Sequence, residues 1–316
     1  MAIMALAKDL PAPDAEFRLT SADGLCISCA RWDSKGETRG VIQIAHGMGE
    51  HIRRYGETIE VLTATGLTVY GNDHRGHGLS ARSPKHMGDF GRGGFELLVE
   101  DMLRLTKLAR EENPDTPLLL FGHSMGSFAA QRLVIDHSHE IDGLVLSGSG
   151  ALDDLAHMAS WAPAGVNLLN AAFEPARTPF DWLSRDACVV DAFINDPLCF
   201  ANLQPDSMAS FLGSAGRLAD PAALAKIRCD LPVYLFSGSE DPVGHHLVGV
   251  KLLMERYRAA GLCEVEHDFY PGGRHEMLNE VNRREVQTRL LGWISGVLER
   301  LEVHPVQIPI THELQR

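Results

Sequence analysis

The chain has 316 residues, of which 45% are hydrophobic and 22% are charged, and its formal net charge is −13 with the histidines neutral. This length can bury the core of one large α/β domain, and the acidic balance disfavours a nucleic-acid partner held through its phosphates. No stretch approaches the length of a membrane span, and residues 1–10 lack the basic flank of a secretory signal.

The first part of the chain predicts a hairpin followed by two buried strands. Residues 1–14 indicate a loose leader, and the turn sequence SADG separates two short alternating runs. One buried strand leads directly into the sequence HGMGEH, and the next ends in the glycine-rich sequence DHRGHG. The elements expected here are strands at 17–20, 25–32, 40–45 and 67–70 and a helix over 52–65.

Six cysteines are spread along the chain, and two of them, Cys26 and Cys29, form a C-x-x-C on the predicted strand 25–32. Positions three apart on a strand face opposite ways, and no second pair or helix start accompanies them. The pattern therefore favours reduced thiols over a metal or redox site, and it fits a cytoplasmic protein.

Helices and strands are expected to alternate through much of the remaining chain. Apolar residues recur at helical spacing over 94–112, where Asn113-Pro114-Asp115 ends the helix. The other expected elements are strands at 118–120, 143–146, 233–236 and 264–270 and a helix over 128–135. A closing helix over about 281–301 has, on its buried face, Val286, Leu290, Trp293, Val297 and Leu301. The alternation predicts an α/β fold with a mostly parallel sheet and helices on both faces.

Residues 151–225 break this alternation and are rich in aromatic side chains. Two of the four tryptophans, Trp161 and Trp182, fall here, as do Phe173, Phe180, Phe193, Phe200 and Phe211. An insertion after a core strand is a common place for a helical cap, so a few of these rings are expected to line a pocket roof. The predicted division is a first core part at 1–150, the cap at 151–225, a second core part at 226–302 and a tail at 303–316.

The sequence Gly122-His123-Ser124-Met125-Gly126 follows the apolar run 118–120 and precedes a predicted helix. A strand, then G-x-S-x-G, then a helix is the context of a nucleophile elbow, in which a tight turn exposes the serine hydroxyl. The small residues Gly122 and Gly126 permit that turn. Ser124 is therefore the candidate nucleophile.

A serine nucleophile needs a base and an orienting carboxylate. The sequence GSEDP at 238–242 and the sequence GGRHE at 272–276 each follow a predicted strand. They supply an acid and His275 in the chain order serine, acid, histidine of α/β-hydrolases. Asp241 and its neighbour Glu240 both offer a carboxylate, and Asp241 is favoured because it directly precedes Pro242 in a turn that recurs in the family that this sequence resembles, as described below.

Two backbone N–H groups are needed to stabilise a developing oxyanion. Met125, which follows the nucleophile, is one candidate donor, and Met48 in the loop His46-Gly47-Met48-Gly49 is the other. The remaining histidines indicate no metal site. His74 and His77 lack a cluster of further ligands, and His46 and His51 are expected to shape the loop. His245 and His246 are expected to face solvent.

Five sequences together resemble the monoacylglycerol lipase/lysophospholipase family of α/β-hydrolases: HGMGEH, DHRGHG, GHSMG, GSEDP and GGRHEMLNE. The similarity extends over about residues 16–300 and includes the cap stretch 184–198. It implies Ser124, Asp241 and His275 as the triad and the N–H groups of Met48 and Met125 as the oxyanion hole. One departure is Ser127, where many relatives carry a second glycine.

The resemblance implies a serine hydrolase that cleaves esters of single-acyl lipids, most simply monoacylglycerols, through an acyl-enzyme and without a metal or organic cofactor. Lysophospholipase, acyltransferase and aminopeptidase activities on the same scaffold stay open, because fold and triad do not fix the substrate. A non-catalytic receptor is a further alternative, which the intact triad argues against. The expected partner is a small ester or lipid; the sequence leaves open whether the cap opens at a membrane surface or micelle.

Overall fold

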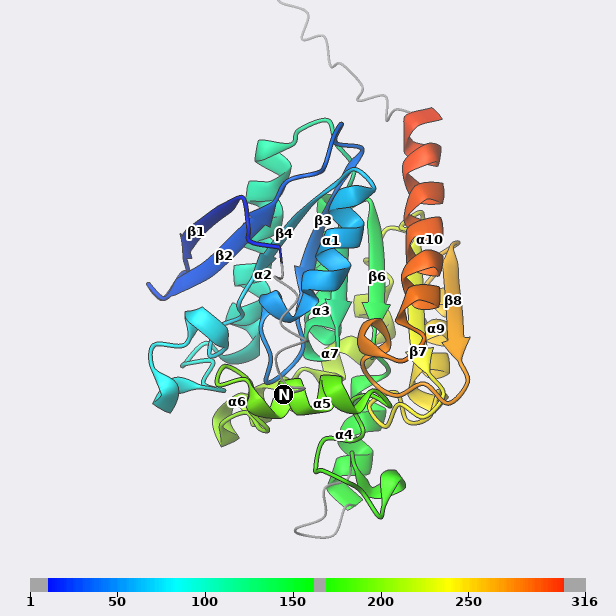
Figure 1. The fold of residues 1–316 in the computed structure, drawn as a ribbon. Helices are drawn as coiled ribbons and strands as arrows, with labels where there is room; N and C mark the ends of the chain where they lie inside the picture. Colours follow the sequence, from blue (N-terminus) through cyan, green and yellow to red (C-terminus); the bar gives the residue numbers. More distant parts are fainter. Residues whose placement is uncertain (1–10, 162–168, 304–316) are drawn as a thin grey trace, which may run out of the picture.

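The computed structural model describes residues 11–161 and 169–303. Its centre is an eight-stranded sheet in the order β1-β2-β4-β3-β5-β6-β7-β8 (Figure 1). β2 pairs antiparallel with β1 and β4, and every other neighbouring pair is parallel. The strands are β1 (Ala15–Thr20), β2 (Cys26–Trp32), β3 (Gly40–Ala45), β4 (Leu67–Asn72), β5 (Leu118–His123), β6 (Gly143–Ser147), β7 (Val233–Gly238) and β8 (Val265–Tyr270). The mostly parallel sheet predicted from the sequence is confirmed.

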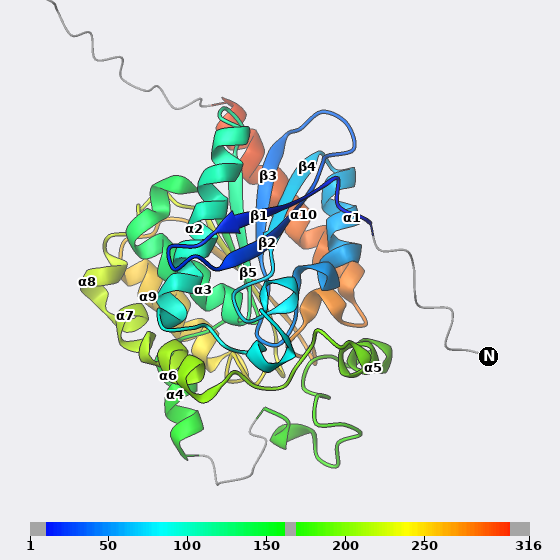
Figure 2. The ribbon, with the colours of Figure 1, turned by 90° about the vertical axis from the view of Figure 1, so that its left-hand side faces the viewer.

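The central strands are buried along their whole length because helices cover both faces of the sheet. One face packs against α2 (Gly94–Glu112), α3 (Met125–His137) and α9 (Val248–Ala259), and the other against α1 (Gly56–Ala64) and α10 (Arg283–Val303). Figure 2 shows these two groups on opposite sides of the sheet. The sheet thus separates two apolar cores.

Three details differ from the sequence-based expectations. The helix expected over 52–65 begins with a 3-10 turn, η2 (Ile52–Tyr55), and continues as α1. α9 was not predicted. On α10 the fully buried positions include Ile294 and Leu298, whereas Trp293 and Leu301 are only partly buried. The other short 3-10 turns are η3 (Gly78–Ser80), η4 (Pro84–His86), η5 (Ser138–Glu140), η6 (Ala171–Phe173) and η7 (Met277–Asn279).

The chain between β6 and β7 forms short helices, which are α4 (Leu152–Trp161), α5 (Ala187–Asn195), α6 (Pro205–Gly213), α7 (Ala215–Ala219) and α8 (Pro221–Leu224). Of these, α4, α5 and α6 lie at the carboxyl ends of the parallel strands (Figure 1), whereas α8 lies beside α9 (Figure 2). Phe211 packs into the core beside α2 and α3, whereas Phe180 and Phe193 pack on each other. The Trp161 side chain, the leader up to residue 10 and the tail from residue 304 lie outside the described part.

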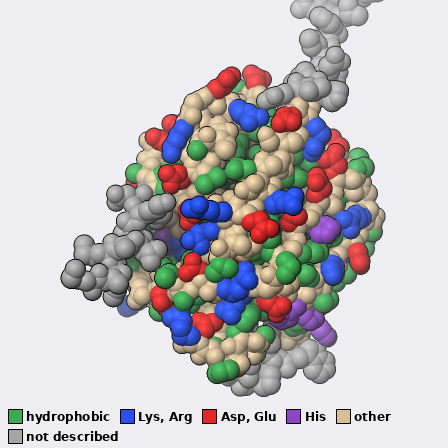
Figure 3. All heavy atoms as spheres, turned by 45° about the vertical axis from the view of Figure 1, so that its right-hand side comes forward, with side chains coloured by type: hydrophobic (Ala, Val, Ile, Leu, Met, Phe, Trp, Pro, Cys, Tyr) green, Lys and Arg blue, Asp and Glu red, His purple; other side chains and the backbone are tan. Residues whose placement is uncertain are grey.

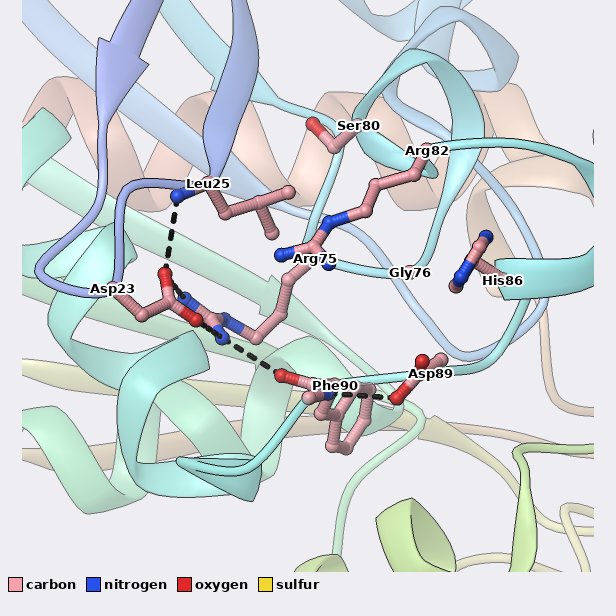
Figure 4. A pocket seen from close by; sticks show the side chains of 10 residues that line it. Asp23, Leu25, Arg75, Gly76, Ser80, Arg82, His86, Asp89 and Phe90 are labelled. Carbon is pink, nitrogen blue, oxygen red and sulfur yellow. Dashed lines mark hydrogen bonds and ion pairs between the residues drawn. The ribbon is translucent and has the colours of Figure 1, made fainter.

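The sequence DHRGHG, which follows β4, is anchored by a buried arginine. Arg75 is fully buried, and its guanidinium donates to Asp23 and to the carbonyl oxygen of Phe90 (Figure 4). It also donates to Asp101 and Ser21. These contacts tie the β1–β2 hairpin to α2. The small cavity in Figure 4 shares no lining residue with the cavity at Ser124. Because the Arg75 guanidinium already donates to protein acceptors, the DHRGHG sequence holds this loop in place and does not bind a ligand through Arg75.

The surface charges and the state of the cysteines match what the composition predicts. Acidic and basic side chains are interspersed on the face shown in Figure 3. Within the described ranges, no helix has the length and hydropathy needed to cross a bilayer. All six cysteines are free thiols, and Cys26 is exposed whereas Cys29 is buried, as their opposite directions on β2 require.

Candidate active site

The turn between β5 and α3 holds Ser124 in a strained conformation, with φ 51° and ψ −123°. A Cβ atom on Gly126 would lie 2.2 Å from the carbonyl oxygen of Ala45, and one on Gly122 would lie 2.6 Å from that of Gly126. Only glycine fits at either position. The Ser127 hydroxyl donates to the Ser124 carbonyl oxygen at 2.6 Å and lies 2.8 Å from the Ser149 hydroxyl, so this departure from the family pattern adds a further tie to the turn.

The loops after β7 and β8 bring together the predicted acid and base. His275 Nδ1 lies 2.9 Å from Asp241 Oδ1, and both side chains are buried. The same carboxylate oxygen accepts the backbone N–H of Val243 at 2.9 Å, which fixes the carboxylate plane. Glu240 is exposed and makes no contact with His275; it lies beside Ser239 and His246. The geometry therefore separates the two acids that the sequence left in competition.

Ser124 and His275 line the same cavity. The Ser124 hydroxyl makes no hydrogen bond to another described residue, so its bond to His275 is not formed in this structure. In free enzymes such bonds are often long and tighten only when substrate is bound.

The two methionines are placed beside Ser124 by separate elements. Met125 is the first residue of α3, where the backbone N–H has no acceptor within the helix. Met48 lies in the loop after β3 and lines the cavity with Ser124. A Cβ atom on the adjacent Gly47 would lie 3.1 Å from the Ser124 Cβ, so the loop passes close to the nucleophile. Both residues therefore lie next to the nucleophile, which is where the donors of an oxyanion hole must lie.

The charge of Asp241 controls the electrostatics of His275. Burial lowers the pKa of the imidazole, but the charge and hydrogen bond of Asp241 outweigh it, and the pKa lies above the ordinary value of 6.5. The neighbouring His123, whose ring centroid is 4.8 Å from that of His275, behaves in the opposite way. Burial and the His275 charge lower the pKa of His123 to about 4, so it is neutral at pH 7.

A buried ionic cluster that the sequence did not reveal joins the Met48 loop to the His275 loop. Arg54 donates to Glu50 at 2.5 Å and to both oxygens of Glu276 at 2.9 Å. Glu50 also accepts the backbone N–H of Gly47 at 2.6 Å and the hydroxyl of Tyr55 at 2.7 Å. Because Glu276 directly follows His275, the cluster fixes the distance between the two loops.

Removing the central cation of this cluster should destabilise the fold. In Arg54→Ala the buried carboxylates of Glu50 and Glu276 lose their counter-charge, which should lower the free energy of unfolding by about 3–5 kcal/mol. The matched control is Arg104→Ala, which breaks an exposed pair with Glu100 and should cost about 0.3–0.5 kcal/mol. Urea unfolding measures both. Equal losses in the two variants would show that the cluster adds nothing to stability.

The cavity at Ser124 has a mainly aromatic roof. Trp182 covers His275, with ring centroids 4.9 Å apart, and its carbonyl oxygen accepts the His275 backbone N–H at 3.3 Å. Phe180, Phe193 and Phe200 also line the cavity, as the aromatic content of the segment predicted. The roof is suited to an apolar chain.

The other histidines have structural partners. His46, His74 and His77 are buried with their rings in contact, and the His46 Nε2 accepts the backbone N–H of His74 at 2.9 Å. Burial lowers the pKa of His74 and of His77 to about 3, so both are neutral. The expectation that His245 faces solvent needs correction, because this half-buried ring lies 2.9 Å from Asp154 on α4.

The chain is similar to known hydrolases over most of its length. Residues 36–282 match the family described as serine aminopeptidase, S33. A monoacylglycerol lipase of Mycolicibacterium smegmatis is 29% identical over 89% of this chain and 96% of its own. A monoglyceride lipase of Mus musculus is 29% identical over 87% of this chain and 89% of its own.

A solved structure shows the same likeness. A thermostable carboxyl esterase of Bacillus coagulans, in complex with glycerol, superposes with a TM-score of 0.82 at 30% identity. The superposition covers 90% of this chain and 98% of the esterase. Fold and sequence thus point to the same group of proteins.

Proposed function

Since this chain belongs to the serine aminopeptidase S33 family of α/β-hydrolases, and is a carboxylic ester hydrolase by its likeness to lipases and esterases, we propose that it hydrolyses monoacylglycerols. The observation that supports the proposal is the cavity lined by Ser124 and by His275, which is bonded to the buried Asp241, beneath an aromatic roof.

In the proposed mechanism His275 accepts the hydroxyl proton of Ser124 while the serine oxygen attacks the ester carbonyl. The N–H groups of Met48 and Met125 stabilise the oxyanion, each by about 3–4 kcal/mol in the transition state. His275 then donates its proton to the departing glycerol oxygen, and the acyl group stays on Ser124. Water, deprotonated by His275, releases the fatty acid. Asp241 orients the ring and stabilises the imidazolium.

Residues 151–225 act, in this proposal, as the cap over the acyl chain. The segment supports an apolar substrate through Trp182, Phe180, Phe193 and Phe200, which all line the cavity. Its backbone is also bonded to the body next to the site, because the N–H of Glu276 donates to the carbonyl oxygen of Leu183 at 2.8 Å. Movement of the cap would therefore open the site directly.

The charges around the cavity favour an uncharged head group. The segment 151–225 has three arginines and nine acids. Each arginine is already paired: Arg177 with Asp191, Arg185 with Glu280 and Arg217 with Asp136. Glu50 and Glu276 line the cavity, whereas none of its described lining residues is a lysine or arginine. A phosphate would meet acidic groups without a free cation.

We therefore expect a higher kcat/KM for a monoacylglycerol than for a lysophosphatidylcholine of equal chain length, both presented below micelle formation. Lysophosphatidic acid, which carries a net negative charge, should be poorer still, and added salt should narrow that gap by screening. Equal or faster turnover of the phospholipid would assign the protein to the lysophospholipases instead.

The family description makes an aminopeptidase the second candidate, and Glu50 and Glu276 are carboxylates that could hold a substrate amino group. Both are already compensated by Arg54, and Asn279 donates to Glu276 at 2.9 Å. An amino group would have to displace these partners. Amino-acid amides should therefore be cleaved far more slowly than monoacylglycerols, and the opposite order would favour the aminopeptidase.

A further inference from the structure

Three potential metal ligands from two distant segments meet at the boundary between cap and core. They are His51, in the loop that carries Met48, and Asp196 and Cys199, just after α5. Their donor atoms all lie within 4.8 Å of one another, and His51 Nε2 is 2.9 Å from Asp196 Oδ2. Within residues 11–161 and 169–303, no other set of three such donors lies as close.

The orientation of the Asp196 carboxylate is fixed by a hydrogen bond from the backbone of the same turn. The Leu198 N–H donates to Asp196 Oδ1 at 2.9 Å, which leaves Oδ2 directed at His51. The Cys199 N–H donates to the Asp196 carbonyl oxygen at 3.0 Å, so the two cap ligands belong to one tight turn. The His51 ring is buried, with a side chain only 8% exposed. Little rearrangement is needed to bring the three donors together.

The local charge balance favours a cation. Arg54 is the positive side chain that acts on this turn, and Glu50, Glu276 and Asp196 oppose it. With the histidines neutral, one positive and three negative charges leave an excess of two negative charges. A divalent cation bound here would offset this excess.

We propose that His51, Asp196 and Cys199 form a binding site for a borderline-soft divalent cation of the Zn²⁺ class, with water as the fourth ligand. Imidazole, carboxylate and thiolate are the ligands that Zn²⁺ takes, and four-coordinate bonds of about 2.0–2.3 Å place donors about 3.3–3.8 Å apart. The three donor atoms lie within 4.8 Å of one another, so the widest separation would have to close by about 1–1.5 Å. The thiol proton is released to solvent as the Zn–S bond forms.

Such a site would connect residues 196–199 of the cap to the loop that carries Met48. The Phe200 N–H already donates to the Gly49 carbonyl oxygen at 2.9 Å, next to the proposed ligands. A bound metal would add a second, stronger connection between the same two segments. The competing interpretation is a simple His51–Asp196 hydrogen bond beside a thiol that only packs against Phe193 and its neighbours.

Titration of the full-length protein with Co²⁺ distinguishes these interpretations, because a thiolate ligand gives a near-ultraviolet charge-transfer band and four-coordination gives intense visible bands. We expect both bands in the wild type at one equivalent, their displacement by Zn²⁺, and their loss in Cys199→Ser and Asp196→Asn. The matched control is Cys188→Ser, an exposed cysteine on α5, which should keep them.

Thermal unfolding supplies an independent readout that does not depend on spectroscopy. A metal that binds only the native state stabilises it by RT ln(1 + c/Kd), where c is the concentration of free metal, so the unfolding midpoint rises with the metal concentration. Zn²⁺ should therefore raise the midpoint of the wild type and of Cys188→Ser, but not that of Cys199→Ser. Absence of the charge-transfer band in the wild type, or its persistence in Cys199→Ser, would overturn the proposal. So would an equal Zn²⁺ effect on all three midpoints.

Discussion

Ser124→Ala should abolish ester hydrolysis and leave the fold intact. Loss of a triad member typically lowers turnover by roughly 10⁴- to 10⁶-fold. The hydroxyl makes no hydrogen bond to a described residue and is only half-buried, so its removal deletes no structural contact. Alanine keeps the Cβ atom that the φ of 51° already accommodates. The measurement is kcat on a short-chain monoacylglycerol, with the thermal midpoint expected at or above that of the wild type.

The matched control is Ser295→Ala on α10, whose hydroxyl bonds only to Glu299 on the same helix and should be dispensable. A fluorophosphonate probe should label the wild type and Ser295→Ala but not Ser124→Ala. Near-wild-type turnover by purified Ser124→Ala, with contaminating esterase excluded, would disprove the mechanism. Failure of the wild type to react with the probe would instead favour a non-catalytic receptor.

The candidate triad could be predicted from the sequence because parallel strands converge. Ser124, Asp241 and His275 each follow a strand, β5, β7 and β8 respectively, and the carboxyl ends of those strands meet at one edge of the sheet. Residues that follow parallel strands can therefore be predicted to lie close together even when more than a hundred residues separate them in the chain. The two glycines of the elbow were also predictable. A Cβ atom at either position would clash with nearby backbone, and any turn of this kind would have the same clash.

The Arg54 cluster could not be predicted in the same way. Arg54 and Glu276 are 222 residues apart, and charged residues are rarely buried, so nothing in the sequence indicates that their side chains meet. α9 was missed for a different reason. Its apolar positions Val250, Leu253, Met254 and Tyr257 do have helical spacing, but left-handed residues from His245 to Leu247 precede it in place of a recognisable cap.

The identity of the acid has the clearest structural argument, because two adjacent carboxylates differ completely in environment. Asp241 is fully buried and contacts His275, whereas the Glu240 side chain is 52% exposed and lies 3.8 Å from His246. Asp241 is also the largest source of the raised His275 pKa. Since the base must be neutral, activity should fall as the pH drops through that pKa, so the acid limb of kcat/KM should lie above pH 6.5 in the wild type.

Asp241→Asn should therefore lose up to roughly 10⁴-fold in kcat, the loss known for the corresponding change in a serine protease. An amide in this place donates a hydrogen bond to His275 Nδ1, which favours the wrong tautomer and removes the charge that stabilises the imidazolium. The control is Glu240→Gln, which changes an exposed carboxylate of the same turn and should keep kcat within about twofold. Any residual activity of Asp241→Asn should have its acid limb at lower pH than the wild type, because the Coulombic support of His275 is gone. Greater loss in Glu240→Gln than in Asp241→Asn would transfer the role to Glu240 and require the loop after β7 to rearrange in the substrate complex.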